Sequence, residues 1–459
     1  MSLHQPTRIL VVGGGGREHA LAWKLAQEPG GNEIIVAPGS AAIAAEPRVR
    51  CVPVDPLNPD AVLGVARSAS AELVVIGPEA PLSVGVADVL AAAGIPVFGP
   101  TRVAAALETS KSFCHEVAEA AGVRMARART FGAGEEDAAI DWIRELDDAG
   151  SSAVLKQDGL AAGKGVIVAD SVEQALALVP SFLAGREPGR PALVVEERLE
   201  GLEASVIAIC DGTRAVALPA ARDHKRLCDG DAGPNTGGMG AYSPLPDLDD
   251  ATVDLVLETV HRPILAGLAR RGTPFRGFLY AGLMLTPDGP TVLECNVRLG
   301  DPEAQVILPR VAGAIGPLLL AAARGRLPVA LPTRVPALPV ASVGIVLAAR
   351  GYPGDPTRGD SISGLEDAAA AGALVFHAGT VGRPAPSGGF GTDGGFATDG
   401  GFGTNGGRVI TVVGRGPDLA AAREVAERAA DAIAWDGMQR RRDIALELPA
   451  AAGVAGAPA

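Results

Sequence analysis

Short apolar runs alternate with longer amphipathic segments over the first hundred residues. The apolar runs predict four strands, RILVV from Arg8, EIIVA from Glu33, ELVVIG from Glu72 and IPVFG from Ile95, and the amphipathic segments predict helices from Glu18 to Gln27 and up to Ala93. Alternation of this kind is typical of a doubly wound α/β domain built on a parallel sheet.

Four consecutive glycines, Gly13 to Gly16, join the first predicted strand to the first helix. A dinucleotide fingerprint would need its third glycine at Glu18 or His19 and an acidic residue at the end of the second strand, and the sequence has neither. A glycine loop at a helix N-terminus still binds phosphate well, so the loop predicts a phosphorylated substrate in place of NAD. A tight turn without a ligand is the alternative.

After the first hundred residues, changes in composition divide the chain into a mixed α/β region, a short linker and a C-terminal region. Residues 109–333 predict a larger mixed α/β region, with a small lobe at about 125–200, and the proline-dense stretch at 331–339 predicts a linker. Strands and turns follow, and a predicted helix from Pro417 to Ala434 ends the pattern. The predicted domains are 1–108, 109–333 and 334–448, with a disordered tail at 449–459.

Composition narrows the class of protein. The 459 residues are 47% hydrophobic and 20% charged, and the formal net charge of -13 disfavours nonspecific binding to nucleic acid or to an anionic membrane. Five scattered cysteines without a CxxC pair predict a reducing compartment and no zinc site. Since no signal-peptide pattern and no long apolar run is found, we expect a soluble cytoplasmic protein.

The segment KQDGLAAGKGVIV, residues 156–168, lies between two strand-like apolar runs. It is not a Walker A motif, because three residues, not four, separate Gly159 from Gly163 and a glycine follows Lys164. Glycines let backbone N–H groups approach an anion, and lysines add positive charge. The segment, with Lys156 and Gly165, predicts a hairpin flap that closes over a polyphosphate; an ordinary glycine-rich hairpin is the alternative.

A second constellation is VLECNVRLGDPEAQ, residues 292–305. Glu294 and Asn296 stand two residues apart, so a strand would present both on one face. Carboxylate and amide oxygens suit Mg²⁺, which bridges substrate phosphates. Arg298 follows on the same side, where it could neutralise a phosphoryl group in transfer. A salt-bridged strand end is the alternative.

A third constellation is ARDHKRLCDGDAGPNTGGMGAYSP, residues 221–244. Its charged half and its glycine-rich half can together bind a small zwitterion and phosphates. The neighbouring apolar strand VIAIC disfavours the alternative, a solvated charge run.

Together these segments resemble the ATP-grasp ligases and, more closely, the phosphoribosylamine–glycine ligase family. The similar strings span about residues 8–448 in the family's order: GGREHALAW near the start, GPEAPL at 77–82, DGLAAGKGV at 158–166, DHKR with GPNTGGMGAYSP at 223–244, GFLYAGLM with N-x-R-x-GDPE at 277–303, RGYPGD at 350–355, FHAGT at 376–380 and TNGGRV at 404–409. The resemblance implies an N-terminal Rossmann-like substrate domain, a two-lobe ATP-grasp core and a C-terminal mixed α/β domain.

The resemblance also implies roles for single residues. ATP phosphates would be contacted by Lys111 and Lys156, under the loop formed by Gly159, Gly163, Lys164 and Gly165. The adenine hinge would be formed by Glu196, Glu197 and Leu199, with Glu203 near the ribose, and Mg²⁺ or Mn²⁺ would be held by Glu294 and Asn296. Glycine and the phosphoryl group would lie near Asp223, Lys225 and Arg298, phosphoribosylamine would face Gly15, Gly16, Arg17, Glu18, His19 and Glu79, and substrate would also be bound by Asp301 and Glu303.

The sequence departs from the family's pattern at Gln157, Arg198, Leu202, Val297 and Leu299. None of these changes removes a phosphate or metal ligand, although Arg198 and Leu202 alter the packing expected around adenine and ribose. The strand FLYAGLML lacks the acidic residue that many ATP-grasp enzymes have before the E-x-N strand. The resemblance therefore implies a metal shell with only two protein ligands identified.

The implied reaction ligates glycine to 5-phosphoribosylamine through a glycyl phosphate, giving glycinamide ribonucleotide, ADP and phosphate in de novo purine biosynthesis. The implied partners are these small molecules, with no nucleic acid and no membrane, and the expected assembly is a monomer or a weak oligomer. The alternatives are another ATP-grasp ligase or carboxylase, a nucleotide-sensing module without turnover, and a dehydrogenase.

A glycine-rich repeat of period six, GGFGTD-GGFATD-GGFGTN from Gly388, interrupts the resemblance. Its composition cannot bury a core, so it predicts a surface loop. Deleting residues 388–399 should leave the melting temperature and the ligase activity nearly unchanged, because loop-closure entropy changes by only ~0.6 kcal/mol per doubling of length. A large loss of activity at unchanged melting temperature would contradict this expectation.

Overall fold

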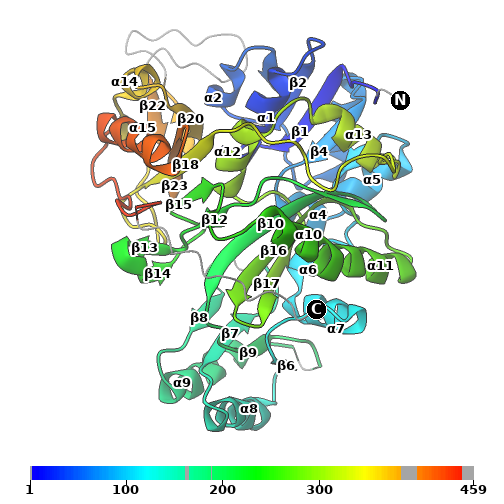
Figure 1. Cartoon of the computed structure of the whole chain (residues 1–459), viewed down its shortest axis with the longest axis vertical. Helices are drawn as coiled ribbons and strands as arrows, with labels where there is room; N and C mark the ends of the chain where they lie inside the picture. The colour runs from blue at the N-terminus through cyan, green and yellow to red at the C-terminus, as the bar shows by residue number, and fades with distance from the viewer. Residues whose placement is uncertain (1–2, 161–164, 188, 384–400, 447–459) are drawn as a thin grey trace.

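The computed structural model describes residues 3–160, 165–187, 189–383 and 401–446. Their strands form six sheets, of which four have at least four strands. Figure 1 shows the N-terminal sheet at the top, the C-terminal elements beside it, a central sheet in the middle and a small lobe at the opposite end. The glycine-rich repeat up to residue 400 and the predicted tail lie outside the described residues.

The N-terminal sheet is parallel and has the order β3-β2-β1-β4-β5. Its strands are β1 (Arg8–Gly13), β2 (Glu33–Pro38), β3 (Val49–Cys51), β4 (Leu73–Ile76) and β5 (Val97–Phe98), and its helices are α1 (Gly16–Ala26), α2 (Ala41–Ala44), α3 (Pro59–Ser68), α4 (Glu79–Ser83) and α5 (Val86–Ala92). The predicted doubly wound α/β class is confirmed. Strand β3 is additional, and its three residues are too few for a periodic signal.

The helices of this domain differ from the expectation: α2 and α3 are additional, and α4 and α5 replace the single helix predicted up to Ala93. Helix α1 begins two residues before Glu18, because the Glu18 carboxylate reaches back to the N–H of Gly15 and caps the helix. Helix α3 was not predicted, although Asn58 caps it and Pro59 occupies its first turn, both of which are recognised start signals.

The central sheet is antiparallel and has the order β11-β10-β16-β17. Its strands are β10 (Leu202–Asp211), β11 (Ala215–Ala217), β16 (Arg276–Thr286) and β17 (Gly289–Asn296), and the helical segments nearby are α6 (Ala106–Thr109), α7 (Lys111–Ala121), α10 (Asp250–Val256), η2 (Leu257–His261), α11 (Arg262–Arg270), α12 (Glu303–Ile307), η3 (Leu308–Arg310) and α13 (Gly316–Ala323). Strand β17 therefore carries the predicted metal ligands at its end.

The small lobe has its own sheet, of order β6-β9-β7-β8, and its own buried apolar cluster. It consists of β6 (Ala128–Phe131), α8 (Glu136–Asp148), β7 (Ala153–Gln157), β8 (Val166–Val168), α9 (Val172–Leu183) and β9 (Leu193–Glu197). Strands β7 and β8 pair as an antiparallel hairpin, which confirms the predicted hairpin. Residues 161–164 lie outside the described residues.

The remaining large sheet, of order β12-β15-β18-β23-β20, combines central and C-terminal segments. It contains β12 (Arg222–Asp223), β15 (Gly240–Ser243), β18 (Ala341–Ala348), β20 (Leu374–His377) and β23 (Arg408–Gly416), with β13 (Arg226–Cys228), η1 (Asp229–Asp231), β14 (Ala232–Asn235), β19 (Ser361–Ile362), α14 (Leu365–Ala370), β21 (Thr380–Gly382), β22 (Phe402–Thr404) and α15 (Leu419–Ala432) nearby. Segment 221–244 is therefore anchored on C-terminal strands.

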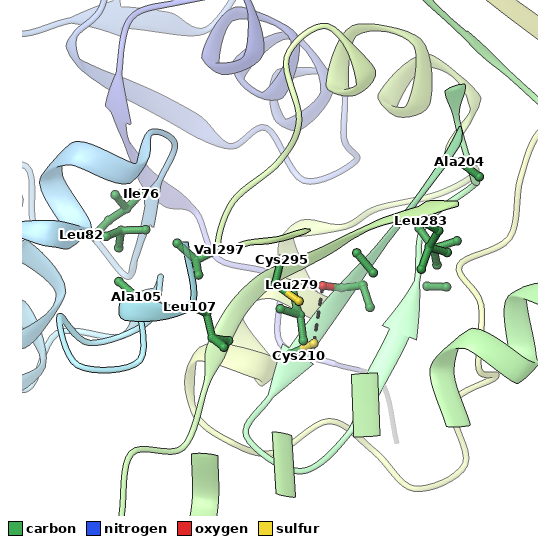
Figure 2. Close-up of a cluster of buried hydrophobic side chains, with 14 of the residues drawn as sticks. Ile76, Leu82, Ala105, Leu107, Ala204, Cys210, Leu279, Leu283, Cys295 and Val297 are labelled. Atoms are coloured by element: carbon green, nitrogen blue, oxygen red, sulfur yellow. Dashed lines mark hydrogen bonds between the residues drawn. The ribbon is translucent and has the colours of Figure 1, made fainter. Parts of the chain in front are cut away.

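The domains share a continuous core. One buried cluster contains Ile76 and Leu82 from the N-terminal domain together with Leu279 and Cys295 from the central sheet and Val297, which directly follows β17 (Figure 2). Packing on both sides of Asn296 therefore fixes the end of β17 in space. All five cysteines are free. Among the described helices, none is long and apolar enough to cross a bilayer.

Candidate active site

Strand β17 presents Glu294 and Asn296 on one face, as their spacing predicts. The Asn296 Nδ2 donates to Glu294 Oε1 at 3.2 Å. The pairing of β17 with β16 shifts register just before Glu294, so Leu293 is an extra residue whose carbonyl oxygen accepts a hydrogen bond from Lys156 Nζ at 2.9 Å. This bulge ties strand β17 to the β7–β8 hairpin of the small lobe.

Three cations from separate segments face the Glu294 carboxylate. Burial alone would raise the pKa of Glu294, but Lys225, Lys156 and Arg298 outweigh it and hold the pKa below its ordinary value. Glu294 is therefore ionised at neutral pH. A half-buried carboxylate surrounded by cations is an arrangement expected where a polyanion and its metal bind.

Lys111, the first residue of α7, lies against the end of the β7 strand and the glycine that follows it. Lys111 Nζ donates to the carbonyl of Gly159 at 3.1 Å, and the Lys111 backbone N–H donates to Asp158 Oδ1 at 2.5 Å. Burial lowers the pKa of Lys111, partly offset by Glu294. The structure thus brings Lys111, Gly159 and Glu294 to one place. Gly165 precedes β8, while Gly163 and Lys164 lie outside the described residues.

The predicted adenine hinge lies at the end of β9, and its two acidic side chains pair with basic residues of the protein itself. Glu196 is 2% exposed and pairs with Lys156 at 2.7 Å and with His115 at 2.9 Å. Glu197 instead pairs with Arg127 near the surface, and Leu199 follows the strand, half-buried. A nucleotide base at this strand would therefore meet backbone groups.

Lys225 joins two acidic residues of the central region. Its Nζ contacts Glu203 at 2.6 Å and Asp223 at 3.1 Å. Burial would lower the pKa of Lys225, but Asp223 and Glu203 raise it well above its ordinary value. Lys225 is therefore a fixed cation next to Glu294, and Glu203 pairs with a lysine that also faces strand β17.

Arg298, just after β17, forms the link to the N-terminal domain. It contacts Glu108 at 2.6 Å and Glu79 at 3.3 Å, and its Nη2 donates to Asn296 Oδ1 at 3.4 Å. These acids raise the pKa of Arg298 despite its burial. Glu108 was missed by sequence reasoning, because a single acid in a short helix gives no motif.

The first turn of α1 is enclosed by its own side chains. Glu18 Oε2 accepts from the N–H of Gly15 at 2.7 Å, and Arg17 Nε donates to Glu18 Oε1 at 2.6 Å. His19 contacts Glu46 at 3.1 Å and accepts from the N–H of His377 at 3.0 Å. The Gly15 N–H is thus satisfied within the protein, and Arg17 supplies the positive charge at this helix end.

Glu303, the first residue of α12, belongs to a buried hydroxyl network that the sequence did not reveal. Tyr280 Oη donates to Glu303 Oε1 at 2.9 Å, and Ser205 lies 2.8 Å from the Tyr280 oxygen. Burial and the charge of Asp223 raise the pKa of Glu303 to about 7, against the opposing effect of Lys225. Tyr280 and Ser205 come from neighbouring strands, so only the fold assembles the network.

The raised pKa of Glu303 makes stability depend on pH. Between the ordinary pKa of 4.5 and about 7, the unfolded chain ionises while folded Glu303 stays protonated, so its contribution to stability is lost as pH rises through this window. We compare the free energy of unfolding of Glu303→Gln with that of the wild type at the same pH. This difference should favour the variant more at pH 8 than at pH 5, by on the order of 3 kcal/mol. A difference that does not change with pH would contradict the assignment; urea unfolding at both pH values measures it.

The donor set fits a hard divalent cation only in part. Glu294 and Asn296 offer oxygen ligands, the type that Mg²⁺ and Mn²⁺ take. No cluster of three His, Cys, Asp or Glu side chains suited to a metal occurs in the part of the chain that the structure describes. A cation at Glu294 would therefore need further oxygens from phosphate groups or water, as Mg²⁺ bound to a nucleotide has.

Comparison with known proteins agrees with this geometry. The three domain models of phosphoribosylglycinamide synthetase match in order: the N domain at residues 7–108, the ATP-grasp (A) domain at 109–304 and the C domain at 342–447. Phosphoribosylamine–glycine ligase from Streptomyces coelicolor is 45% identical over 446 residues, covering 96% of this chain and 99% of that protein. Its counterpart from Caulobacter vibrioides is 44% identical over 441 residues, covering 95% and 97%.

The fold agrees as well. The crystal structure of phosphoribosylamine–glycine ligase from Thermotoga maritima matches with a TM-score of 0.75 and 33% identity, covering 95% of this chain and 100% of that one. The predicted family is thereby confirmed over nearly the whole length. This chain belongs to the phosphoribosylamine–glycine ligase family of ATP-grasp enzymes.

Proposed function

We propose that this protein ligates glycine to 5-phosphoribosylamine, consuming ATP and giving glycinamide ribonucleotide, ADP and phosphate for purine biosynthesis. The observation that carries the proposal is the ionised Glu294 among Lys156, Lys225 and Arg298, which come from three separate segments. Such a centre can bind a nucleotide polyphosphate, its metal ion and the carboxylate of glycine close to one another. Membership of the family gives the two organic substrates.

Lys111 and Lys156 would hold the phosphates of ATP, with Gly159, Gly163, Lys164 and Gly165 of the flap above them. The backbone at Glu196, Glu197 and Leu199 would take adenine, since the two acidic side chains are already paired. Glu203, beside Lys225, would lie near the ribose. Glu294 and Asn296 would hold Mg²⁺ or Mn²⁺, which spreads negative charge on the phosphates when bound.

The chemical problem is that a carboxylate does not accept amines. Glycine's carboxylate oxygen would attack the terminal phosphorus of ATP, ADP would leave, and the amine of phosphoribosylamine would then attack the acyl carbon as phosphate departs. Lys225, Asp223 and Arg298 would orient glycine and the phosphoryl group, which is catalysis by positioning and electrostatics without a covalent nucleophile. A flap that excludes water would protect the acyl phosphate from hydrolysis.

The N-terminal side of the site would hold phosphoribosylamine. Arg17 and Glu79 lie next to Arg298, and Gly15, Gly16, Glu18 and His19 form the adjoining helix end. Asp301 and Glu303 come shortly after Arg298 in the sequence. Asp301 lies near Arg17 of the N-terminal domain, and Glu303 lies near Asp223. The amine would thus approach from the N-terminal domain toward glycine at the central sheet.

The deciding assay is ADP release from ATP and Mg²⁺ with freshly generated phosphoribosylamine. We expect release that requires both glycine and phosphoribosylamine. Release with bicarbonate or another acid in place of glycine would indicate a different ATP-grasp ligase or carboxylase. ATP binding without any ADP release would indicate a nucleotide-sensing module.

For the organisation of the chain we propose the domains 1–108, 109–333, with the flap lobe at about 125–200, and 334–448. We propose a cytoplasmic monomer or weak oligomer without nucleic-acid or membrane partners. Sedimentation velocity at micromolar concentration would reveal a stable oligomer if one forms.

A further inference from the structure

Arg408, the first residue of β23, lies where the C-terminal domain meets two loops of the candidate active site. Its Nη1 donates to the backbone carbonyl of Gly237 and to that of Asp301. Its Nη2 lies 3.6 Å from the Asp301 carboxylate. One planar guanidinium therefore joins the glycine-rich loop before β15 to the turn between β17 and α12, with a geometry that a single ammonium does not reproduce.

Tyr352, which follows β18 in the same C-terminal domain, holds the glycine-rich loop from a second side. Its hydroxyl oxygen accepts a hydrogen bond from the Gly237 N–H at 2.8 Å. Its ring lies against Gly407, where a Cβ would come within 2.3 Å of the ring. Arg408 and Tyr352 thus bind the carbonyl and the N–H of the same residue, Gly237.

The contact is closely packed. A Cβ on Gly237 would lie 2.9 Å from the Arg408 guanidinium carbon, and a Cβ on Gly238 would lie 2.5 Å from the Pro302 ring. Gly238 also has φ +109°, which favours glycine. The close approach of the two loops therefore requires glycine at position 238, whereas a side chain at position 237 would displace the Arg408 guanidinium from its partners.

The Asp301 carboxylate is the group that this contact holds in place. Gln305 Nε2 donates to it at 2.8 Å from α12. Burial would raise the pKa of Asp301, but Arg408 and Arg17 lower it, so the carboxylate is ionised. Arg408 thus contributes both to the position of Asp301 and to its charge.

We propose that Arg408 is a positioning residue for the phosphoribosylamine subsite, through which the C-terminal domain aligns Asp301 and the loop at Gly237. The inference rests on the proposed function, because it takes Asp301 as a substrate contact. It assigns a role to Arg408 of the string TNGGRV and to Tyr352 of the string RGYPGD, which the proposed reaction leaves without one. Arg408 itself contacts protein groups, so its effect on turnover would pass through Asp301.

The test compares Arg408→Met and Arg408→Lys with the wild type in the ligase assay. We expect Arg408→Met to lower kcat/KM for phosphoribosylamine by about 10²-fold, since a misplacement of about 1 Å can have this effect. The KM for ATP should change less than twofold. Arg408→Lys should recover only part of the loss, because one ammonium cannot serve two carbonyls and a carboxylate.

Two further measurements exclude a merely structural role. Millimolar guanidinium should restore part of the activity of Arg408→Ala and none of that of Arg408→Lys. Tyr352→Phe, a milder change, should raise the KM for phosphoribosylamine with little change in melting temperature. Arg350→Met is the matched control, because this arginine of the same domain is exposed and, among the described residues, its ion pair is with the exposed Asp436.

Equal losses of kcat/KM for all three substrates, or an unchanged KM for phosphoribosylamine in Arg408→Met and Tyr352→Phe, would overturn the proposal. Binding of ribose 5-phosphate, measured by calorimetry, should weaken in Arg408→Met and not in Arg350→Met, and this readout does not depend on turnover. Wild-type protein without glycine-dependent ADP release would instead refute the proposed function, whatever Arg408 does.

Discussion

Glu294→Ala should abolish ligase turnover while the protein remains folded. The substitution removes a carboxylate that faces Lys225, Lys156 and Arg298 and that we propose as an oxygen ligand of the divalent cation. Metal stabilisation of phosphoryl charge contributes several kcal/mol, and each 1.36 kcal/mol is tenfold in rate, so kcat should fall by ~10³-fold or more. Steady-state ADP release at saturating substrates measures the loss.

A matched control lies in the same hairpin. Asp288 sits in the turn between β16 and β17, and its side chain is 78% exposed against Arg124 at the surface. Asp288→Ala should keep kcat within twofold, because it removes one exposed charge from the same strand pair. Near-normal turnover of Glu294→Ala at ordinary Mg²⁺ concentrations would refute the metal assignment.

The pairing of Glu294 with Asn296 could be predicted because it depends on local spacing alone. Strand alternation places residues two apart on one face, whatever the strand packs against. The parallel N-terminal sheet and the β7–β8 hairpin were predictable for the same reason, since each follows from apolar runs and glycines close together in sequence. The roles of the site residues stay predictions that activity measurements must test.

Contacts over long sequence separations could not be predicted in this way. Glu108 meets Arg298 across 190 positions, and Arg408 meets Gly237 across 171. No local pattern encodes either pair, because each forms only when separate sheets pack together. The same holds for Tyr280 and Ser205, whose apolar strands gave no sign that their hydroxyls converge on Glu303.

Arg298→Met should reduce both stability and activity, for separable reasons. The change leaves Glu108 and Glu79 without their nearest cation, and breaking a buried pair in this way costs about 3–5 kcal/mol in the free energy of unfolding. Burial already raises the pKa of Glu108, and loss of Arg298 would raise it further. Since protonation then removes the unpaired charge, the deficit relative to wild type should shrink from pH 8 to pH 5.

The double variant Arg298→Met with Glu108→Gln separates the two effects. The glutamine removes the buried charge that Arg298 neutralises, so it should restore most of the lost stability at pH 8. Turnover should stay ~10³-fold below wild type, because the variant lacks the guanidinium that we propose to stabilise the phosphoryl group in transfer. Urea unfolding and ADP release on the same preparations measure both quantities. If turnover returned together with stability, Arg298 would act only by pairing with Glu108, and its role in phosphoryl transfer would have to be abandoned.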